Sequence, residues 1–513
     1  MQWQVPINQK TKSPSFRFHP NQPNIPPPPP PPPPNNTAWF SISFLSSTPS
    51  EKTMTVVSIF KLALFFTLTS TLVTISLQQE QPLLLNSAEQ DSVYQVLSSI
   101  NSATNWRTLF PDDLCSYPPH GVVCDYFTDP TTKNVTVHVT ELSFGYVSDF
   151  TPNPSCSPNS TFSPLLFTSF KHLRKLFFYQ CFTQTQAFVP DIPTTFGSSL
   201  EELVFINNRA FVGPLSSITG NFTSLRRLVL SGNGIHGAIP NAIGDLANIE
   251  EITLSRNKLS GKVSVNLSKL KKLKILDLSG NGFHGNVPSS VGNLTHLLKL
   301  DLSSNGFSGK IPESLSNLQA LDFLDLSFNR FGNFGVPLFL AAMTRLKEVH
   351  LSGNLLGGEI PEIWGNLGGI LGIGFSNMGL VGEIPASMGL HLRNLCYLGL
   401  DNNKLNGKVP EEFGFLEFVN EINLENNNLS GRLPFSANFT AKFGEKLRLK
   451  GNPELCVDEK LSHRESVGEL KKCSKPEIPN PVLFIGVSHS GLLSSSSSFL
   501  VLLLFWGLWI LLA

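Results

Sequence analysis

The chain has 513 residues and carries no net charge, because 38 Lys and Arg residues balance 38 Asp and Glu residues. This balance indicates neither a nucleic-acid-binding surface nor an acidic tail, so nucleic acid is not an expected partner. Length alone would suggest about three domains. A 24-residue internal period instead predicts one continuous domain.

The beginning of the chain differs from the rest. Nine consecutive prolines at 26–34 cannot pack into a core and predict an extended polyproline segment. Met54 then opens a stretch typical of a secretory signal, in which mostly apolar residues at 62–75 follow a lysine. We therefore expect a signal peptide at 54–80. Because such signals begin near the true amino terminus, residues 1–53 are interpreted as an artefact of the gene model; a long leader or an internal membrane anchor are the alternatives.

A phrase of the form Leu/Ile-x-Leu-x-x-Asn recurs through the middle of the chain. Its closing residue is repeated every 24 positions at Asn233, Asn257, Asn281, Asn305 and Asn329. A period of 20–29 residues with this phrase is typical of leucine-rich repeats. Looser copies extend the series in both directions, so that twelve phrases run from Cys181 to Asn452.

The phrase predicts a short strand followed by a turn. Leu228 and Leu230 alternate with outward-facing residues, which is the period of a strand with one buried face. The asparagine can satisfy backbone groups where the chain turns inward, away from water. Stacked in parallel, such coils predict an α/β solenoid, a leucine-rich repeat horseshoe or superhelix with a parallel sheet on its concave face. One copy has Met378 in place of asparagine and is predicted to be locally weaker.

A second phrase, Leu/Phe-x-Gly-x-Ile/Val-Pro, follows most of these asparagines, as at 307–312. With it, the repeat resembles the plant-specific class of leucine-rich repeat over about residues 82–475. Extra residues between Phe331 and Pro337 depart from the pattern and predict a distinct local loop. The resemblance implies an amino-terminal cap, about twelve repeats and a carboxy-terminal cap, at 81–135, 136–450 and 451–475.

The same resemblance implies a disulfide in each cap. In the amino-terminal cap of such proteins a tryptophan precedes a cysteine pair, as Trp106 precedes Cys115 and Cys124. Gly-Asn-Pro-Glu-Leu-Cys at the other end matches the carboxy-terminal cap and implies a bridge between Cys456 and Cys473. Caps cover the apolar core that the end coils would otherwise expose.

Three cysteines lie outside these cap motifs. Cys156 and Cys181 lie on adjacent coils and are candidates for a third bridge. Alternatively, Cys181 only replaces the asparagine that closes the strand phrase in other copies. Cys396 precedes a strand phrase and is expected to be a free, partly buried thiol. This cysteine usage agrees with a secretory compartment.

Seven Asn-x-Ser/Thr sequons follow the signal and predict glycosylation at surface positions. Only one of them lies close to a strand phrase, so glycans are expected on the convex side and the edges. The sites are Asn134, Asn159, Asn221, Asn266, Asn293, Asn428 and Asn438.

The chain ends in fifteen apolar residues at 499–513. That run is short for a membrane-spanning helix, which needs about 20 residues, and no positive residue follows it. A serine-rich linker at 476–498 and small residues around Ser488 complete the layout of a glycosylphosphatidylinositol signal. We expect a lipid anchor at Ser488; a single span beginning at Leu492 is the alternative.

The sequence shows no catalytic constellation, metal-ligand spacing or cofactor motif, so neither an enzyme nor a bound cofactor is expected. The glycine-rich run at 368–374 is interpreted as the turn and strand of one coil. Asp277, Asp301 and Asp325 occupy one strand position in successive coils and could bind a cation or a basic ligand. However, Leu-Asp-Leu-Ser is the usual phrase of this repeat class, which favours a structural role.

Residues between the buried leucines face the concave surface, where exposed aromatic side chains are often interface anchors. Three groups are candidates for ligand or partner contact. They are Lys175, Phe177 and Tyr179; Phe323, Phe328 and His350; and Tyr397 with Asp401.

Residues 170–179, the cap at 114–124 and the charge-free tail resemble one group of plant receptor-like proteins. It is typified by Piriformospora indica-insensitive protein 2 and is related to Too Many Mouths. The resemblance covers about 80–513. It implies a kinase-lacking protein at the extracellular face of the plasma membrane. Such a protein would bind a protein, peptide or glycan ligand and act through a membrane co-receptor kinase, in signalling towards microbes or growth. A polygalacturonase-inhibiting protein and a structural wall protein are the alternatives.

Overall fold

The computed structural model describes residues 83–474, apart from short gaps at 148–152, 190–191, 194–195, 218–221, 462–466 and 468–469. The chain divides into two units, Met1–Gln81 and Pro82–Ala513. All described residues belong to the second unit. The predictions for residues 1–53, the signal peptide, the linker and the tail with Ser488 lie outside the described residues.

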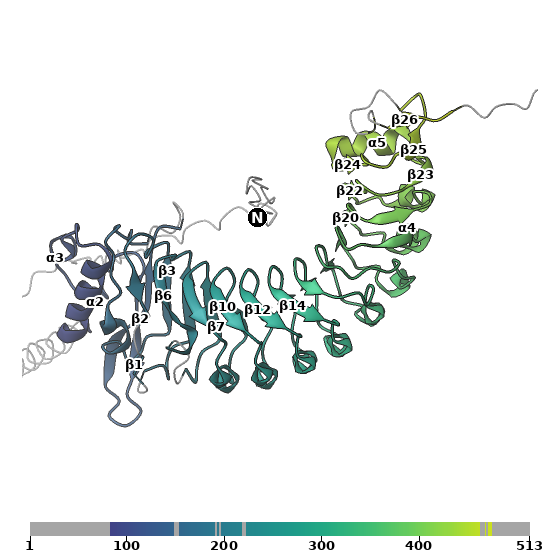
Figure 1. The fold of residues 1–513 in the computed structure, drawn as a ribbon. Helices are drawn as coiled ribbons and strands as arrows, with labels where there is room; N and C mark the ends of the chain where they lie inside the picture. Colours follow the sequence, from purple (N-terminus) through teal and green to yellow (C-terminus); the bar gives the residue numbers. More distant parts are fainter. Residues whose placement is uncertain are drawn as a thin grey trace, which may run out of the picture. The chain divides into compact units, whose positions relative to one another are not determined.

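One large sheet unites the repeats (Figure 1). Its 14 described strands run in the order β1-β2-β3-β5-β7-β9-β11-β13-β15-β17-β18-β20-β22-β24. β1 (Val122–Thr128) is antiparallel to β2 (Val135–Phe144), and all later neighbours are parallel. The remaining twelve strands come from the twelve predicted phrases. They are β3 (Lys175–Tyr179), β5 (Glu202–Ile206), β7 (Arg227–Ser231), β9 (Glu251–Thr253), β11 (Ile275–Asp277), β13 (Lys299–Asp301), β15 (Phe323–Asp325), β17 (Glu348–His350), β18 (Gly372–Gly374), β20 (Tyr397–Gly399), β22 (Glu421–Asn423) and β24 (Leu447–Arg448).

The second phrase of most repeats forms further short strands. A seven-stranded sheet contains β4 (Ala187–Phe188), β6 (Phe211–Pro214), β8 (Gly234–Gly237), β10 (Lys258–Gly261), β12 (Gly282–Gly285), β14 (Gly306–Gly309) and β16 (Arg330–Phe331). This sheet ends at the irregular segment Phe331–Pro337, as the extra residues there suggest. In the next coil only an isolated bridge, Glu359 to Val381, is formed on this side. Pairing resumes with β19 (Val381–Glu383) and β21 (Lys404–Asn406), and the carboxy-terminal cap adds β23 (Ser430–Arg432), β25 (Glu454–Val457) and β26 (Lys471–Lys472).

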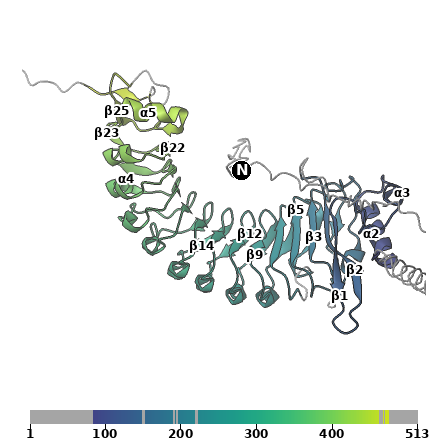
Figure 2. The same cartoon turned by 180° about the vertical axis from the view of Figure 1, so that it is seen from behind.

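Short helices return the chain on the side opposite the large sheet (Figure 2). Six are short 3-10 helices that follow the second phrase, and all of them except η4 begin directly after its proline: η3 (Asn241–Asp245), η4 (Val265–Lys269), η5 (Ser289–Asn293), η6 (Glu313–Asn317), η7 (Leu338–Ala342) and η9 (Glu411–Phe415). The others are α2 (Ser87–Ile100), α3 (Trp106–Leu109), η1 (Pro164–Phe167), η2 (Leu215–Ser217), η8 (Trp364–Asn366), α4 (Ala386–His391), α5 (Ala437–Phe443) and η10 (Gly444–Lys446). Leucines of the strand phrase, such as Leu276, Leu300 and Leu324, are fully buried between the two sides. This column of apolar side chains is continuous through the described repeats and drives their stacking.

The asparagines of the strand phrase form the predicted ladder of buried hydrogen bonds. Asn329 is a typical member: its amide donates to the carbonyls of Leu302 and Leu326, and its oxygen accepts the backbone N–H of Phe307. Such an asparagine therefore binds both its own coil and the preceding one. Satisfying these inward-facing backbone groups is necessary because an unpaired buried amide costs about 1–3 kcal/mol.

Two coils lack the ladder asparagine, and in both of them the asparagine of the next coil accepts a backbone hydrogen bond. The backbone N–H of Met378 donates to Asn403 Oδ1 at 2.9 Å, and that of Cys181 donates to Asn208 Oδ1 at 2.8 Å. Met378 itself is fully buried. The local weakness of this coil stays a prediction. Its stability depends on Asn403, which accepts the backbone N–H of Met378.

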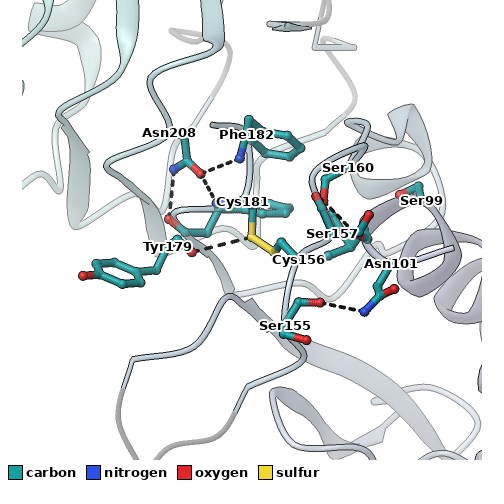
Figure 3. The surroundings of a disulfide bond; sticks show 12 residues. Ser99, Asn101, Ser155, Cys156, Ser157, Ser160, Tyr179, Cys181, Phe182 and Asn208 are labelled. Atoms are coloured by element: carbon teal, nitrogen blue, oxygen red, sulfur yellow. Dashed lines mark hydrogen bonds between the residues drawn. A yellow bond between two sulfur atoms is a disulfide. The ribbon is translucent and has the colours of Figure 1, made fainter. Parts of the chain in front are cut away.

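All three expected disulfides are formed: Cys115–Cys124, Cys156–Cys181 and Cys456–Cys473. Figure 3 shows how the second of them fastens the segment at 155–160 to the end of β3. The same segment is held to the end of α2, because Ser160 Oγ donates to the Ile100 carbonyl at 2.6 Å. The interpretation of Cys181 as only a ladder variant is therefore wrong. Cys396 is free and half-buried, as expected.

None of the helices in the described part of the chain is both long enough and apolar enough to cross a membrane.

Candidate ligand-binding face

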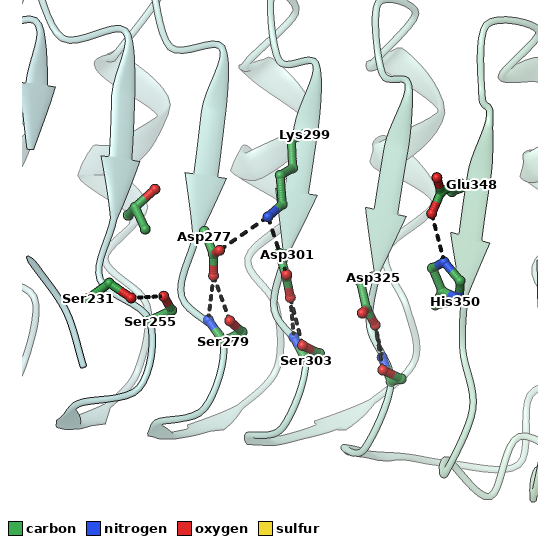
Figure 4. A network of polar contacts seen from close by, with 12 residues as sticks. Ser231, Ser255, Asp277, Ser279, Lys299, Asp301, Ser303, Asp325, Glu348 and His350 are labelled. Carbon is green, nitrogen blue, oxygen red and sulfur yellow. Dashed lines mark hydrogen bonds and ion pairs between the residues drawn. The ribbon is translucent and has the colours of Figure 1, made fainter. Parts of the chain in front are cut away.

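The exposed face of the large sheet carries the side chains that lie between the buried apolar residues of each strand phrase. The last residues of β11, β13, β15 and β17 form one row, because Asp277, Asp301, Asp325 and His350 are in register on neighbouring strands. Figure 4 shows this row with a parallel row of serines beside it. The predicted aspartate column thus exists, and His350 continues it.

Each aspartate is held by the serine two residues later. Asp277 Oδ1 accepts from the backbone N–H and the hydroxyl of Ser279, at 3.1 and 2.6 Å. Asp301 has the same pair of contacts with Ser303. These contacts use one carboxylate oxygen to close the turn, which is the structural role that the repeat phrase favours.

Lys299 partly neutralises the row. Its ammonium lies 3.2 Å from Asp277 Oδ2 and 3.6 Å from Asp301 Oδ2. Burial opposes the charged form of Lys299, but the two carboxylates raise its pKa overall. Burial, and then the charges of Asp277 and Asp325, raise the pKa of Asp301 to about 6. In the described residues, no group of three or more His, Cys, Asp and Glu side chains is arranged to hold a metal ion.

Asp301→Asn is expected to stabilise the protein at pH 8 and to have little effect at pH 4. The pKa of Asp301 is about 6 in the folded chain and near 3.8 in the unfolded chain. The folded state therefore favours the protonated carboxyl, and stability is lost as the pH rises through this range. Asparagine keeps the acceptor for Ser303 without the charge, so a gain of about 1–3 kcal/mol is expected. Denaturant unfolding at both pH values measures it; a loss of stability at pH 8 would contradict this explanation.

The second candidate group is only partly assembled. The rings of Phe323 and His350 lie 5.7 Å apart, and the Lys299 ammonium lies 5.3 Å from the Phe323 ring centroid. All three are half-buried on the sheet face. Phe328, by contrast, follows the strand in a turn with a positive φ of 52°, and 62% of its surface is exposed. Phe328 therefore lies in the bend after β15, and its part in ligand contact stays a prediction.

The first candidate group lies on β3, with Lys175, Phe177 and Tyr179 half-buried on the sheet face. The Lys175 ammonium lies 3.3 Å from Glu141 Oε2 on the neighbouring strand. The structure therefore places all three side chains together, as the alternation of the phrase indicates.

In the third group, the ring of Tyr397 lies over its own strand and does not project into solvent. Tyr397 is half-buried, and its hydroxyl lies 2.5 Å from where a Cβ of Gly399 would be. His350 Nδ1 lies 2.6 Å from the equivalent point on Gly374. The glycines thus leave room for these two rings over the strands. Burial, and then Asp401 and Glu421, raise the pKa of Tyr397. The glycine run was correctly placed in one coil, but this role of Gly374 was missed; glycine at an outward strand position was its signal.

Sequence reasoning also missed a ladder of ion pairs at the beginning of the strands. Arg226 donates to Glu250 at 2.7 Å, and Lys274 donates to the same carboxylate at 2.6 Å. Arg227 lies between Glu202 and Glu251, at 3.1 and 2.9 Å. The sequence contains a sign of these pairs, since two acidic and two basic residues alternate at the start of successive strand phrases. These exposed pairs contribute little stability individually, about 0–1 kcal/mol.

The described sequons are compatible with glycosylation outside the sheet face. Asn266 lies in η4 and Asn293 at the end of η5, on the opposite side of the coils. Asn134, Asn159, Asn428 and Asn438 are exposed. Asn221 lies outside the described residues. Glycosylation of these sites stays a prediction.

Comparison with known proteins supports the repeat assignment. A family model described as leucine rich repeat matches residues 223–283, and a second one matches 296–318, 345–367 and 394–416. Protein TOO MANY MOUTHS from Arabidopsis thaliana is 37% identical over 138 residues, which are 27% of this chain and 26% of that protein. Piriformospora indica-insensitive protein 2 from the same plant is 34% identical over 152 residues, 29% of this chain and 34% of that protein. The alignments thus span about a quarter to a third of these relatives.

Solved structures show the same fold. A plant peptide hormone receptor, RGFR1 in complex with RGF2, has a TM-score of 0.52 and 25% identity, covering 60% of this chain and 52% of that one. PEPR1–AtPEP1 has a TM-score of 0.52 at 23% identity, covering 72% and 52% of the two chains. The chain therefore has the leucine-rich repeat fold, and over part of its length it is similar to leucine-rich repeat receptor-like proteins.

Proposed function

We propose that this protein is a cell-surface receptor-like protein that binds a peptide or protein ligand on the face of its large sheet. It acts at the extracellular face of the plasma membrane, without a kinase of its own, and signals through a membrane co-receptor kinase. A role towards microbes or in growth is part of the same proposal. Support comes from the similarity to a solved plant peptide hormone receptor with its bound partner.

The observation that carries the proposal is the composition of the sheet face between β11 and β17. Lys299, Phe323 and His350 form a half-buried aromatic and charged cluster beside the row of aspartates. Such a surface offers an aromatic anchor, a cation and hydrogen-bond acceptors within a few side chains of one another. Interfaces commonly combine an aromatic centre with polar surroundings in this way.

Phe323→Ala together with His350→Ala is expected to weaken ligand or partner binding by about tenfold or more, as truncation of central interface residues usually does. Folding should be preserved, because both side chains lie on the exposed face and not in the core. Phe418→Ala is the matched control, since 58% of Phe418 is exposed and it lies outside the strands.

The measurement is recovery of plant membrane proteins and apoplastic peptides on the immobilised wild type and the two variants, quantified by mass spectrometry. A receptor kinase or peptide lost only with the double variant supports the proposal. Equal recovery on all three proteins would exclude this cluster as the binding site.

A further inference from the structure

Two histidines and a buried glutamate meet where the amino-terminal cap packs on the first repeat. Glu89 of α2 is only 9% exposed. Its Oε1 accepts the backbone N–H of Val139 at 2.9 Å, and its Oε2 lies 2.9 Å from His138 Nδ1. One carboxylate therefore joins the cap helix to β2 through two contacts.

The second histidine comes from the loop that leads into β3. The ring of His172 stacks on that of His138, with centroids 4.2 Å apart and planes inclined by 28°. Phe127 of β1 covers both, with its centroid 4.3 Å from His172 and 5.7 Å from His138. Four separate segments, α2, β1, β2 and the loop before β3, thus converge on the two imidazole rings.

The charges around the rings do not match two protons. Glu89 is the carboxylate that contacts a ring, and it contacts His138. Lys171 adds a positive charge beside His172. Asp125 of β1 is engaged by Arg174 and by Thr140. If both rings were protonated, two like charges would lie in stacking contact with a single carboxylate to offset them, which is unfavourable.

We propose that Glu89, His138 and His172 form a pH-sensitive latch that holds the amino-terminal cap on the first repeat and loosens on acidification. Burial, and then the neighbouring His138, lower the pKa of His172 from its ordinary value of 6.5. His172 therefore binds a proton less readily in the folded state than in the unfolded chain. The stabilisation is complete above about pH 6.5 and is lost as the pH falls through the lowered pKa.

The latch has a direct route to the candidate binding face. Arg174, two residues after His172, donates its backbone N–H to the Thr140 carbonyl at 2.8 Å, beside His138. β3 begins at the next residue, Lys175, and carries the first candidate contact group. Loosening of the latch would therefore release the start of this strand from β2.

Hydrogen exchange of the purified secreted protein tests the latch. Between pH 7.5 and 5, after correction for the intrinsic exchange rate, peptides covering α2, β1–β2 and residues 171–179 are expected to lose protection by about threefold or more. Peptides covering β20–β22 serve as the internal reference. In His172→Phe, which keeps a ring but cannot titrate, the loss of protection in the cap is expected to disappear. His296→Gln, at an exposed histidine, should behave like the wild type.

Two results would overturn the proposal. One is a cap whose protection does not change with pH in the wild type. The other is the same acid-induced loss in His172→Phe as in the wild type. If His172→Phe does not fold, His172→Gln provides the same comparison without a titrating ring. These outcomes are independent of whether the sheet face binds a ligand.

Discussion

Asn403→Ala is expected to destabilise the protein by about 3–5 kcal/mol, more than alanine at any regular ladder position. Asn403 Oδ1 accepts two backbone N–H groups, from Met378 at 2.9 Å and Leu380 at 3.1 Å. Its amide donates to the carbonyls of Phe375 and Leu400 at 2.8 and 2.9 Å. The regular Asn427 accepts only the N–H of Leu405 among the described contacts. Removal of Asn403 therefore leaves one more buried amide without a partner.

Denaturant unfolding of Asn403→Ala, Asn427→Ala and an exposed control, Asn286→Ala, measures this difference. The control should remain within about 0.5 kcal/mol of the wild type. If Asn403→Ala and Asn427→Ala lose equal stability, the hydrogen bond from Met378 to Asn403 contributes nothing measurable to the free energy of unfolding. A substantial loss in the control would show that the measurement is not specific to the ladder.

Removal of the Cys156–Cys181 bridge, by alanine at both positions, is expected to cost about 3–4 kcal/mol. The bridge spans 25 residues of sequence, and a loop of this length adds substantial entropy to the unfolded chain when it is opened. The cost should fall mainly on the cap, because Ser157 and Ser160 tie the bridged segment to the Ile100 carbonyl at the end of α2.

The free Cys396 supplies the matched control. Cys396→Ala removes a half-buried thiol without opening a loop and should change stability by less than about 1 kcal/mol. Thermal unfolding under non-reducing conditions compares the two variants. A double variant as stable as Cys396→Ala would show that the bridge does not support the cap.

Most of the fold could be predicted from the sequence because the same strand and turn phrases recur in many repeats. Most copies combine the strand period, the asparagine and the glycine-proline phrase, so an irregular copy does not obscure the period of the others. The cap disulfides could be inferred for a related reason, since their motifs resemble known caps. The sequence could not show that Asn403 serves Met378, because this contact joins residues 25 positions apart across two coils.

The candidate site was predicted less completely. Alternation correctly placed Phe323 and His350 on one face, since their positions follow the strand period. Alternation could not show that Phe328 has a positive φ in the bend after the strand. The contact between His138 and His172 could not be predicted, because it depends on the packing of the cap helix and a loop. Neither segment has a repeated sequence pattern.

Site-specific photocrosslinking tests the central claim most directly, namely that the sheet face binds the ligand. A photoreactive phenylalanine analogue would replace Phe323 on this face, or Phe418 outside the strands, in protein displayed on plant cells. We expect crosslinks to an extracellular peptide or protein from position 323 and none above background from position 418. Crosslinks from position 418 alone, with none from 323, would contradict it.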